Sequence, residues 1–556
     1  MTRNKLSVVA ILFAAILAAT LPAMAQTVEV VGAGSSAMWQ GAAYAAWHDL
    51  AGATAGTHYT VKGSCTSGNC AQLKDQRSSS IALEGGNLWV VWNSAQTEVW
   101  AYLSVDSVVG NRCYRATPRC LLQIDSETEN TTGTVVPASQ TNLISSGLWG
   151  ADATALPTAV YTALNGAPVT AAFTDIRPED AKFAQCRTSS ALNTTNYSGL
   201  GYGSSCTQLV ATAPIKSNFS SSVANPVAFN LSGVDPFNGD PIPASTTIPV
   251  GAAPIIFIAN QTDATGLGSA SVTNVTVNSS GTGTAQGLWE NKAACNATTL
   301  GGGSAPVTVL LREPMSGTMN TTEFTNFRLV GSGLGSASQE NDINPTLGSG
   351  APGASNNPLN LTCASGGGSR QRVIGTGEMV KEVGKIADSI GYVFFSYGNV
   401  ASIAPTTAVP AGIGKYLTLN GVDPIQATYT NGELPTCTAP CPVAAGKSFP
   451  NLRNGTYRAW SLLRVTTNAT GTNFTHVSAL VTALQNDVNS TVPDFVPYKT
   501  TNGSDPGFST ELYRSHYLQS GVSPNNGLSG QTEAGGDVGG CIEKVAAAPG
   551  ILSCHQ

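Results

Sequence analysis

Charged side chains are scarce in this chain of 556 residues, since Asp, Glu, Lys and Arg together make up 11%. The formal net charge of -6 is acidic, which argues against the basic surface that a nucleic-acid partner requires. Histidine is rarer still, with five scattered residues, and the cysteines form no CxxC pair and no CxxCH motif. Zinc ribbons, haem attachment sites and thiol redox centres need those patterns. We therefore expect no metal, no cofactor and no nucleic-acid partner.

Long apolar runs are also lacking, with one exception at the N-terminus. Arg3 and Lys5 precede the apolar residues 6–21, and residues 23–25 (AMA) place small side chains at the positions where a signal peptidase cuts. This order predicts a secretory signal peptide over residues 1–25, cleaved near Gln26, and a mature chain that does not span a membrane. No cysteine follows the cut, so a lipid anchor is not expected. We expect a bacterial protein that is periplasmic or secreted.

A nucleophile elbow of the form G-x-S-x-G is absent as well, and the sequence shows no nucleophile paired with a base, so we do not expect an enzyme. The twelve cysteines are an even number, which in an exported protein favours disulfides. The simplest pairing joins neighbours along the chain: Cys65/Cys70, Cys113/Cys120, Cys186/Cys206, Cys295/Cys363, Cys437/Cys441 and Cys541/Cys554.

Several segments follow the order strand, tight turn, helix. Such alternation predicts an α/β architecture with partly parallel sheets. β-Branched or buried runs predict strands at residues 27–31, 169–173, 307–311 and 390–395, and apolar side chains at helical spacing predict helices around residues 39–50, 324–327, 379–386 and 477–484.

The longest interruption of this pattern is an insertion over residues 71–167. It begins with residues 88–92 and 99–103, which predict a hairpin whose large aromatic side chains form a small core. Tracts rich in Gly, Ser, Thr and Asn are interpreted as loops that decorate the fold: residues 266–287, 331–368 and 401–410.

Three turns have the composition of an anion site. Residues 34–36 (GSS), residues 63–68 (GSCTSG) and Arg312 with residues 316–318 (SGT) combine small residues with hydroxyl donors. Backbone N–H groups at the start of a helix attract anions, and a guanidinium grips an oxyanion through two donors. Each charge-assisted bond contributes about 1.5–3 kcal/mol, so a handful supports micromolar binding.

These motifs, in this order, resemble those of bacterial phosphate-binding proteins, the substrate-binding components of phosphate ABC transporters. Residues 32–36 (GAGSS) are similar to that family's N-terminal GAG-x-[ST], residues 174–175 (TD) to its [ST]-D-x-P, and residues 312–318 (REPMSGT) to its R-x-D-G-S-G-T. Residues 375–377 (GTG) and 390–393 (IGYV) resemble its G-x-x-G…IGY unit.

The resemblance implies a type II periplasmic-binding-protein fold, with two α/β lobes joined by a hinge around an interlobe cleft. The first lobe would take residues 26–225 and 456–556, and the second residues 226–455. Hinge crossings would lie at residues 226–230 and 457–463.

The resemblance also implies roles for single residues. Ser36 and Ser64 would donate hydroxyl hydrogen bonds to phosphate, and backbone N–H groups near Ala37 and Gly317 would assist. Arg312 would supply the positive charge, and Asp175 would accept the proton of a protonated oxyanion and so discriminate against sulfate. The complete implied site is Ser36, Ala37, Ser64, Asp175, Arg312, Ser316, Gly317 and Thr318.

Two departures bear on this carry-over. Pro314 stands where the family has an acidic residue in the Arg312 loop, and Arg177 adds a positive charge close to Asp175. Two alternatives remain open beside phosphate uptake with a transporter permease as partner. One is a secreted surface-interaction protein that kept the fold and lost the ligand, and the other is a secreted phosphatase.

Overall fold

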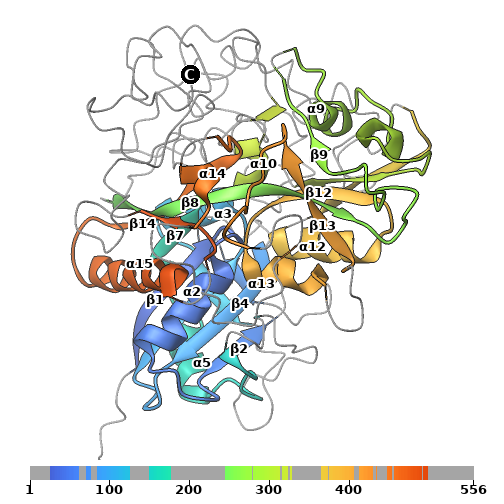
Figure 1. The fold of residues 1–556 in the computed structure, drawn as a ribbon. Helices are drawn as coiled ribbons and strands as arrows, with labels where there is room; N and C mark the ends of the chain where they lie inside the picture. Colours follow the sequence, from blue (N-terminus) through green and yellow to red (C-terminus); the bar gives the residue numbers. More distant parts are fainter. Residues whose placement is uncertain are drawn as a thin grey trace, which may run out of the picture.

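The computed structural model describes the chain in blocks that begin at Gln26 and end at Tyr498, drawn in colour in Figure 1. The described residues are 26–61, 71–74, 76, 84–124, 144, 149–176, 245–278, 280–312, 316–322, 326–327, 363, 365–373, 375–405, 412–429, 434, 448–453, 456–490 and 493–498.

The described strands form one mixed sheet whose main path runs β11-β10-β12-β8-β14-β7-β1-β5-β4-β3-β6. β1 pairs in parallel with β5 and β7, and β10 pairs in parallel with β11 and β12. The strands are β1 (Thr27–Gly34), β2 (His58–Val61), β3 (Ala71–Lys74), β4 (Glu84–Trp92), β5 (Glu98–Ser104), β6 (Leu121–Ile124), β7 (Ala171–Thr174), β8 (Ser245–Asn260), β9 (Asn274–Val275), β10 (Thr308–Arg312), β11 (Ser369–Val373), β12 (Ser389–Phe394), β13 (Gly414–Leu419), β14 (Trp460–Asn468) and β15 (Val496–Pro497).

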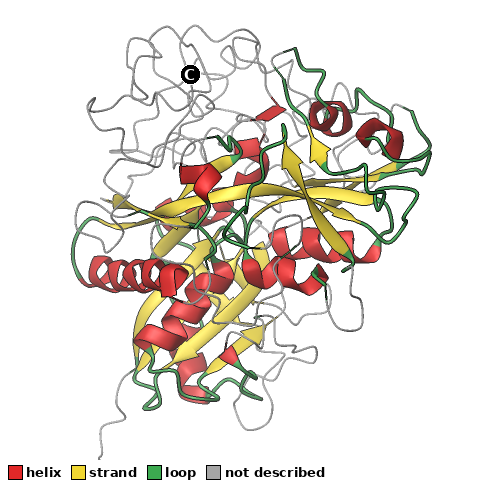
Figure 2. Cartoon of the chain, viewed as in Figure 1, coloured by secondary structure: helices red, strands yellow, loops and turns green. Residues whose placement is uncertain are grey.

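Helices lie between these strands and confirm the expected α/β class (Figure 2). They are α2 (Trp39–Ala45), α3 (Ser107–Arg115), α5 (Thr158–Leu164), α9 (Thr284–Trp289), α10 (Gly317–Thr322), α12 (Gly375–Lys385), α13 (Tyr397–Val400), α14 (Pro450–Arg453) and α15 (Thr472–Ser490). A π-helical turn, η1 (Ala46–Leu50), continues α2, and 3-10 turns occur at η5 (Ala297–Leu300) and η8 (Ala401–Ile403).

The long strand β8 divides the sheet into two parts. Residues Ser245 to Pro254 pair with β14, whereas Ile255 to Asn260 pair with β12 and β13. We call β6, β3, β4, β5, β1, β7 and β14 the first half-sheet, and β11, β10, β12 and β13 the second half-sheet. The predicted crossing at residues 457–463 lies where β8 passes from one to the other, because Trp460 pairs with Pro254. The other predicted crossing, residues 226–230, lies outside the described residues.

The first half-sheet is covered by helices on both faces, which follows from the alternation along its strands. Trp89 and Trp100 point to the face covered by α2, η1 and α15, while Val90 and Val99 point to the face covered by α3 and α5. Period-two alternation sends neighbouring side chains to opposite faces. Both faces are therefore apolar, as in sheets buried between helices.

The aromatic hairpin is present, but its expected position outside the main fold is wrong. β4 and β5 pair antiparallel, and β5 also pairs with β1 near the middle of the sheet. Trp89 and Tyr102 are fully buried in the main core, where their rings meet edge to face at 6.0 Å. The hairpin pairs with a central strand and is thus part of the scaffold.

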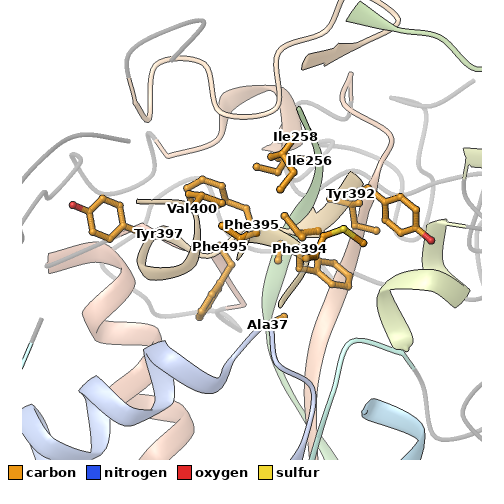
Figure 3. Packing of buried hydrophobic residues seen from close by; sticks show 14 of the residues in the cluster. Ala37, Ile256, Ile258, Tyr392, Phe394, Phe395, Tyr397, Val400 and Phe495 are labelled. Atoms are coloured by element: carbon orange, nitrogen blue, oxygen red, sulfur yellow. The ribbon is translucent and has the colours of Figure 1, made fainter. Parts of the chain in front are cut away.

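The second half-sheet packs on the first through a continuous apolar core. Ile256 and Ile258 of β8 and Phe394 of β12 lie in this core, and Ala37, in the turn between β1 and α2, borders it from the other half-sheet (Figure 3). The described helices include none that is long and apolar enough to cross a membrane. Of the six predicted disulfides, Cys113–Cys120 and Cys295–Cys363 are confirmed, and the other four lie outside the described residues.

Candidate anion-binding site

Asp175 lies directly after β7, where the strand leaves the sheet. The Thr174 hydroxyl closes this turn, since it donates to the Ile176 carbonyl at 2.8 Å and accepts from the Ile176 N–H at 3.1 Å. Ser461 of β14 donates to the Asp175 carbonyl at 2.6 Å. The Asp175 backbone is therefore held by its own strand and by the neighbouring one.

The Asp175 carboxylate is 1% exposed and accepts hydrogen bonds from two hydroxyl groups. Ser107, the first residue of α3, donates to Oδ1, and Thr318 of α10 donates to Oδ2 at 3.3 Å. Burial raises the pKa of Asp175, while the Ser107 hydrogen bond, the positive charge of Arg312 and the Thr318 hydrogen bond lower it. The carboxylate thus sits in a dry environment that is fitted with hydroxyl donors.

Gly317 allows this close approach between α10 and Asp175. An ideal Cβ at this position would lie 1.6 Å from Asp175 Oδ1 and 2.8 Å from Ser107 Oγ. Such contacts are far inside van der Waals range, so a side chain here would displace the carboxylate. Ser316, directly before α10, closes the first turn of this helix, because its hydroxyl accepts from the Met319 N–H at 3.2 Å.

Arg312 ends β10 and is 1% exposed. Its positive charge opposes the rise that burial causes in the pKa of Asp175, but burial remains the larger effect and the pKa stays raised. Tyr102 of β5 is a further buried neighbour, because burial and the Asp175 charge raise its pKa well above the usual value. Segments far apart in the sequence therefore converge on one carboxylate.

Ser36 and Ala37 occupy a second contact between the half-sheets. The Ser36 hydroxyl donates to Thr376 Oγ1 at 3.0 Å and accepts from the Thr376 N–H at 3.0 Å, at the start of α12. The Ala37 N–H donates to Ser35 Oγ at 3.2 Å, and the Ser35 carbonyl accepts from the Tyr102 hydroxyl. In the structure the Ser36 hydroxyl and the Ala37 N–H form hydrogen bonds to other residues of the chain. Tyr102 links this contact to Asp175, because its hydroxyl donates to Ser35 and the Asp175 charge acts on it.

The structure thus brings Asp175, Arg312, Gly317 and Thr318 together and places Ser316 directly beside them. Ser36 and Ala37 make no hydrogen bond to this group within the described chain. Ser64, Arg177 and Pro314 lie outside the described residues.

Sequence reasoning missed Ser107, Thr376 and Ser461. A signal for Ser107 existed, because residues 99–103 followed by Asp106 and Ser107 repeat the strand, turn, helix order of the other candidate segments. The segment was interpreted as an inserted hairpin, so the helix behind it was not considered.

Comparisons with known proteins give matches among solved structures. No family model and no curated protein matches the chain. Among solved structures, a phosphate-binding protein from Stenotrophomonas maltophilia shares 13% identity at a TM-score of 0.34, covering 84% of this chain and 90% of its own. A putative phosphate ABC transporter substrate-binding protein from Clostridium perfringens, with bound phosphate, shares 15% at 0.26, covering 46% and 72%.

An ABC-type phosphate transport receptor from Vibrio cholerae shares 14% identity at a TM-score of 0.24, covering 43% of this chain and 67% of its own. All three of these solved structures are described as phosphate-binding or phosphate-transport proteins. TM-scores this low carry no argument about what the chain binds, which depends on its own side chains.

Proposed function

We propose that the chain binds inorganic phosphate, or a related protonated oxyanion, between the two half-sheets and acts as an extracytoplasmic solute-binding protein. The observation that carries this proposal is the buried Asp175 carboxylate, surrounded by the hydroxyls of Ser107 and Thr318 and by the charge of Arg312. One positive group, one acceptor and several hydroxyls match an anion that still carries a proton.

Phosphate would use this set as follows. Its O–H group donates to Asp175 in place of one of the two hydroxyls, and the displaced hydroxyl turns to donate to a phosphate oxygen. Arg312 binds the remaining negative charge, because a guanidinium forms paired bonds to oxyanions. At the upper end of about 1.5–3 kcal/mol each, three charge-assisted bonds bring the affinity into the micromolar range.

Asp175 would also discriminate between phosphate and sulfate. A fully deprotonated dianion such as sulfate has no proton to donate, so it meets the carboxylate as an unpaired buried charge. Burial strengthens this repulsion, because the charges are poorly screened in a dry site.

Closure of the two half-sheets would complete the site. Asp175 and Ser107 come from the first half-sheet, and Arg312 and Thr318 come from the second, so only the closed arrangement satisfies the ligand from both sides. The proposed lobes are residues 26–225 with 456–556, and residues 226–455. A chain exported by residues 1–25 would deliver its anion to an ABC transporter permease.

Calorimetric titration of the chain without residues 1–25, first with phosphate and then with sulfate, tests the proposal. Phosphate is expected to bind at micromolar or lower Kd, and sulfate at least tenfold more weakly. Asp175→Asn should weaken phosphate binding and strengthen sulfate binding, because the amide can donate where the carboxylate only accepts.

The matched control is Asp152→Asn, because Asp152 is a buried carboxylate that accepts the Thr60 N–H of β2, away from the Asp175 group. It should leave the preference between the two anions unchanged. Absence of heat with both anions contradicts the proposal and favours the surface-interaction alternative.

A further inference from the structure

Two segments from opposite ends of the described chain meet on the outer side of the first half-sheet. The π-helical turn η1 follows α2, and both pack against α15, which lies beside α2 in Figure 1. π-Helical turns are rare and recur at functional sites, because the wider turn redirects side chains. Here the turn presents His48 and Asp49 to α15.

A ligand set of one imidazole and two carboxylates results. One nitrogen of His48 and one oxygen each of Asp49 and Asp487 lie within 4.8 Å of one another. His48 Nδ1 is 2.6 Å from Asp49 Oδ1 and 3.7 Å from Asp487 Oδ1. The Tyr44 ring stacks on the imidazole at 5.0 Å, with 13° between the planes.

Asp487 supplies the second observation that points to a ligand. Its side chain is 7% exposed, and its Oδ2 has no hydrogen-bond partner in the described part of the chain. A buried carboxylate next to another carboxylate is costly unless a cation or a donor compensates it.

We propose that His48, Asp49 and Asp487 bind one divalent transition-metal ion of the Zn²⁺ type. Imidazole nitrogen with carboxylate oxygens is a donor set that Zn²⁺ accepts, whereas Ca²⁺ and Mg²⁺ prefer oxygen alone. Small rotations of His48 and Asp49, which lie at the surface, would bring the donors to metal–ligand distances of about 2.0–2.2 Å. The ion would tie η1 to α15 and neutralise the Asp487 charge.

This site escapes sequence analysis, which led us to expect no metal. His48 and Asp49 lie in one short turn, and their third partner comes from a helix near the end of the described chain. No local spacing links them, and only the packing of α15 on η1 brings the three together.

Titration calorimetry with Zn²⁺ tests the proposal, using chelator-treated protein in a phosphate-free buffer. One ion should bind per chain with micromolar Kd. His48→Gln and Asp487→Asn should each weaken binding at least tenfold. Asp487→Asn preserves shape and removes a buried charge, so it should fold and allow a clear result even if another variant does not.

The matched control is His476→Gln, because His476 also lies on α15 and pairs with a carboxylate, Glu29, at 2.6 Å. It should bind Zn²⁺ like the parent chain. Zn²⁺ should also raise the Tm of the parent chain and leave that of Asp487→Asn unchanged. Absence of Zn²⁺ binding, or binding that Asp487→Asn leaves intact, overturns the proposal, and neither outcome bears on phosphate.

Discussion

The Thr318 hydroxyl lies 3.3 Å from Asp175 Oδ2 and so links α10, in the second half-sheet, to the end of β7 in the first. Gly317, one residue earlier, packs its Cα against the same carboxylate. A pair of adjacent residues therefore provides both the polar contact and the space that it needs. The proposed anion site depends on this contact, which the first prediction tests, and the second prediction tests the Ser107 hydrogen bond to the same carboxylate.

Gly317→Ala should reduce phosphate affinity at least a hundredfold. The new methyl group would lie 1.6 Å from Asp175 Oδ1, so either α10 or the carboxylate must move away. Calorimetric titration with phosphate measures the effect. Gly377→Ala in α12 is the control, because its methyl group meets only Asn399 Oδ1, at 3.5 Å. If Gly317→Ala binds phosphate like the parent chain, the close packing of Gly317 against Asp175 is not part of the site.

Ser107→Ala should weaken phosphate binding about tenfold to a hundredfold and move its pH dependence upward. The Ser107 hydrogen bond lowers the pKa of Asp175, so its loss lets burial raise that pKa further. The carboxylate then becomes protonated at a higher pH, and phosphate affinity should decline at a higher pH as well. A hydrogen bond to a charged group contributes about 1.5–3 kcal/mol, which sets the expected size.

Titrations with phosphate at several pH values measure this shift. Ser402→Ala serves as control, because Ser402 is exposed and donates only to the Asn399 carbonyl. If Ser107→Ala shows the same pH profile as the parent chain, Ser107 does not control the ionisation of Asp175.

Local sequence patterns predicted much of the scaffold. The strands at β1, β7, β10 and β12 and the helices α12 and α15 lie where alternation and helical spacing indicated, because short-range periodicity carries that information. Asp175, Arg312 and Thr318 were found through their motifs, each at the end of a strand or the start of a helix.

Long-range pairing could not be predicted in the same way. The alternating sequence of the β4–β5 hairpin would be the same at the edge of a sheet and near its middle. Only the pairing of β5 with β1 shows that the hairpin lies near the middle. The role of Ser107 depends on that pairing, because α3 follows β5 directly and so reaches Asp175. A serine at the start of a helix is common and carries no sign of a partner 68 positions away.

His58 should make the chain lose stability as the pH falls from about 6.5 toward 4. Its ring is 1% exposed and stacks on Trp149 at 4.4 Å, and burial lowers its pKa to about 4. The unfolded chain binds the proton at higher pH than the folded chain, so the stabilisation is complete above pH 6.5 and disappears through pH 4. The loss is on the order of 2 kcal/mol.

Chemical denaturation of the parent chain and His58→Gln at pH 7, 5.5 and 4.5 measures this contribution. The variant should lose less free energy of unfolding over this range, whatever its absolute stability. Asp152, whose pKa burial raises to about 6, lies 3.9 Å from the His58 ring, so the two chains are compared in an Asp152→Asn background. Equal slopes in both chains would contradict the assignment to His58.

Asp494→Asn should stabilise the chain, and more so at pH 8 than at pH 5. Asp494 is buried and accepts the Tyr397 N–H at 2.7 Å through Oδ1, and burial raises its pKa to about 7. Because the folded pKa lies above the unfolded value, the stabilising protonated state is lost as the pH rises through 7. Asparagine keeps an oxygen acceptor for Tyr397 and carries no charge at either pH.

The gain in stability at pH 8 should exceed that at pH 5 by on the order of 2 kcal/mol. Thermal and denaturant unfolding at both pH values measure it. Asp263→Asn is the control, because Asp263 is only partly buried and hydrogen bonds from Thr265 lower its pKa, so it stays ionised across this range. An equal gain at the two pH values would mean that Asp494 is ionised throughout, with its charge compensated in the fold.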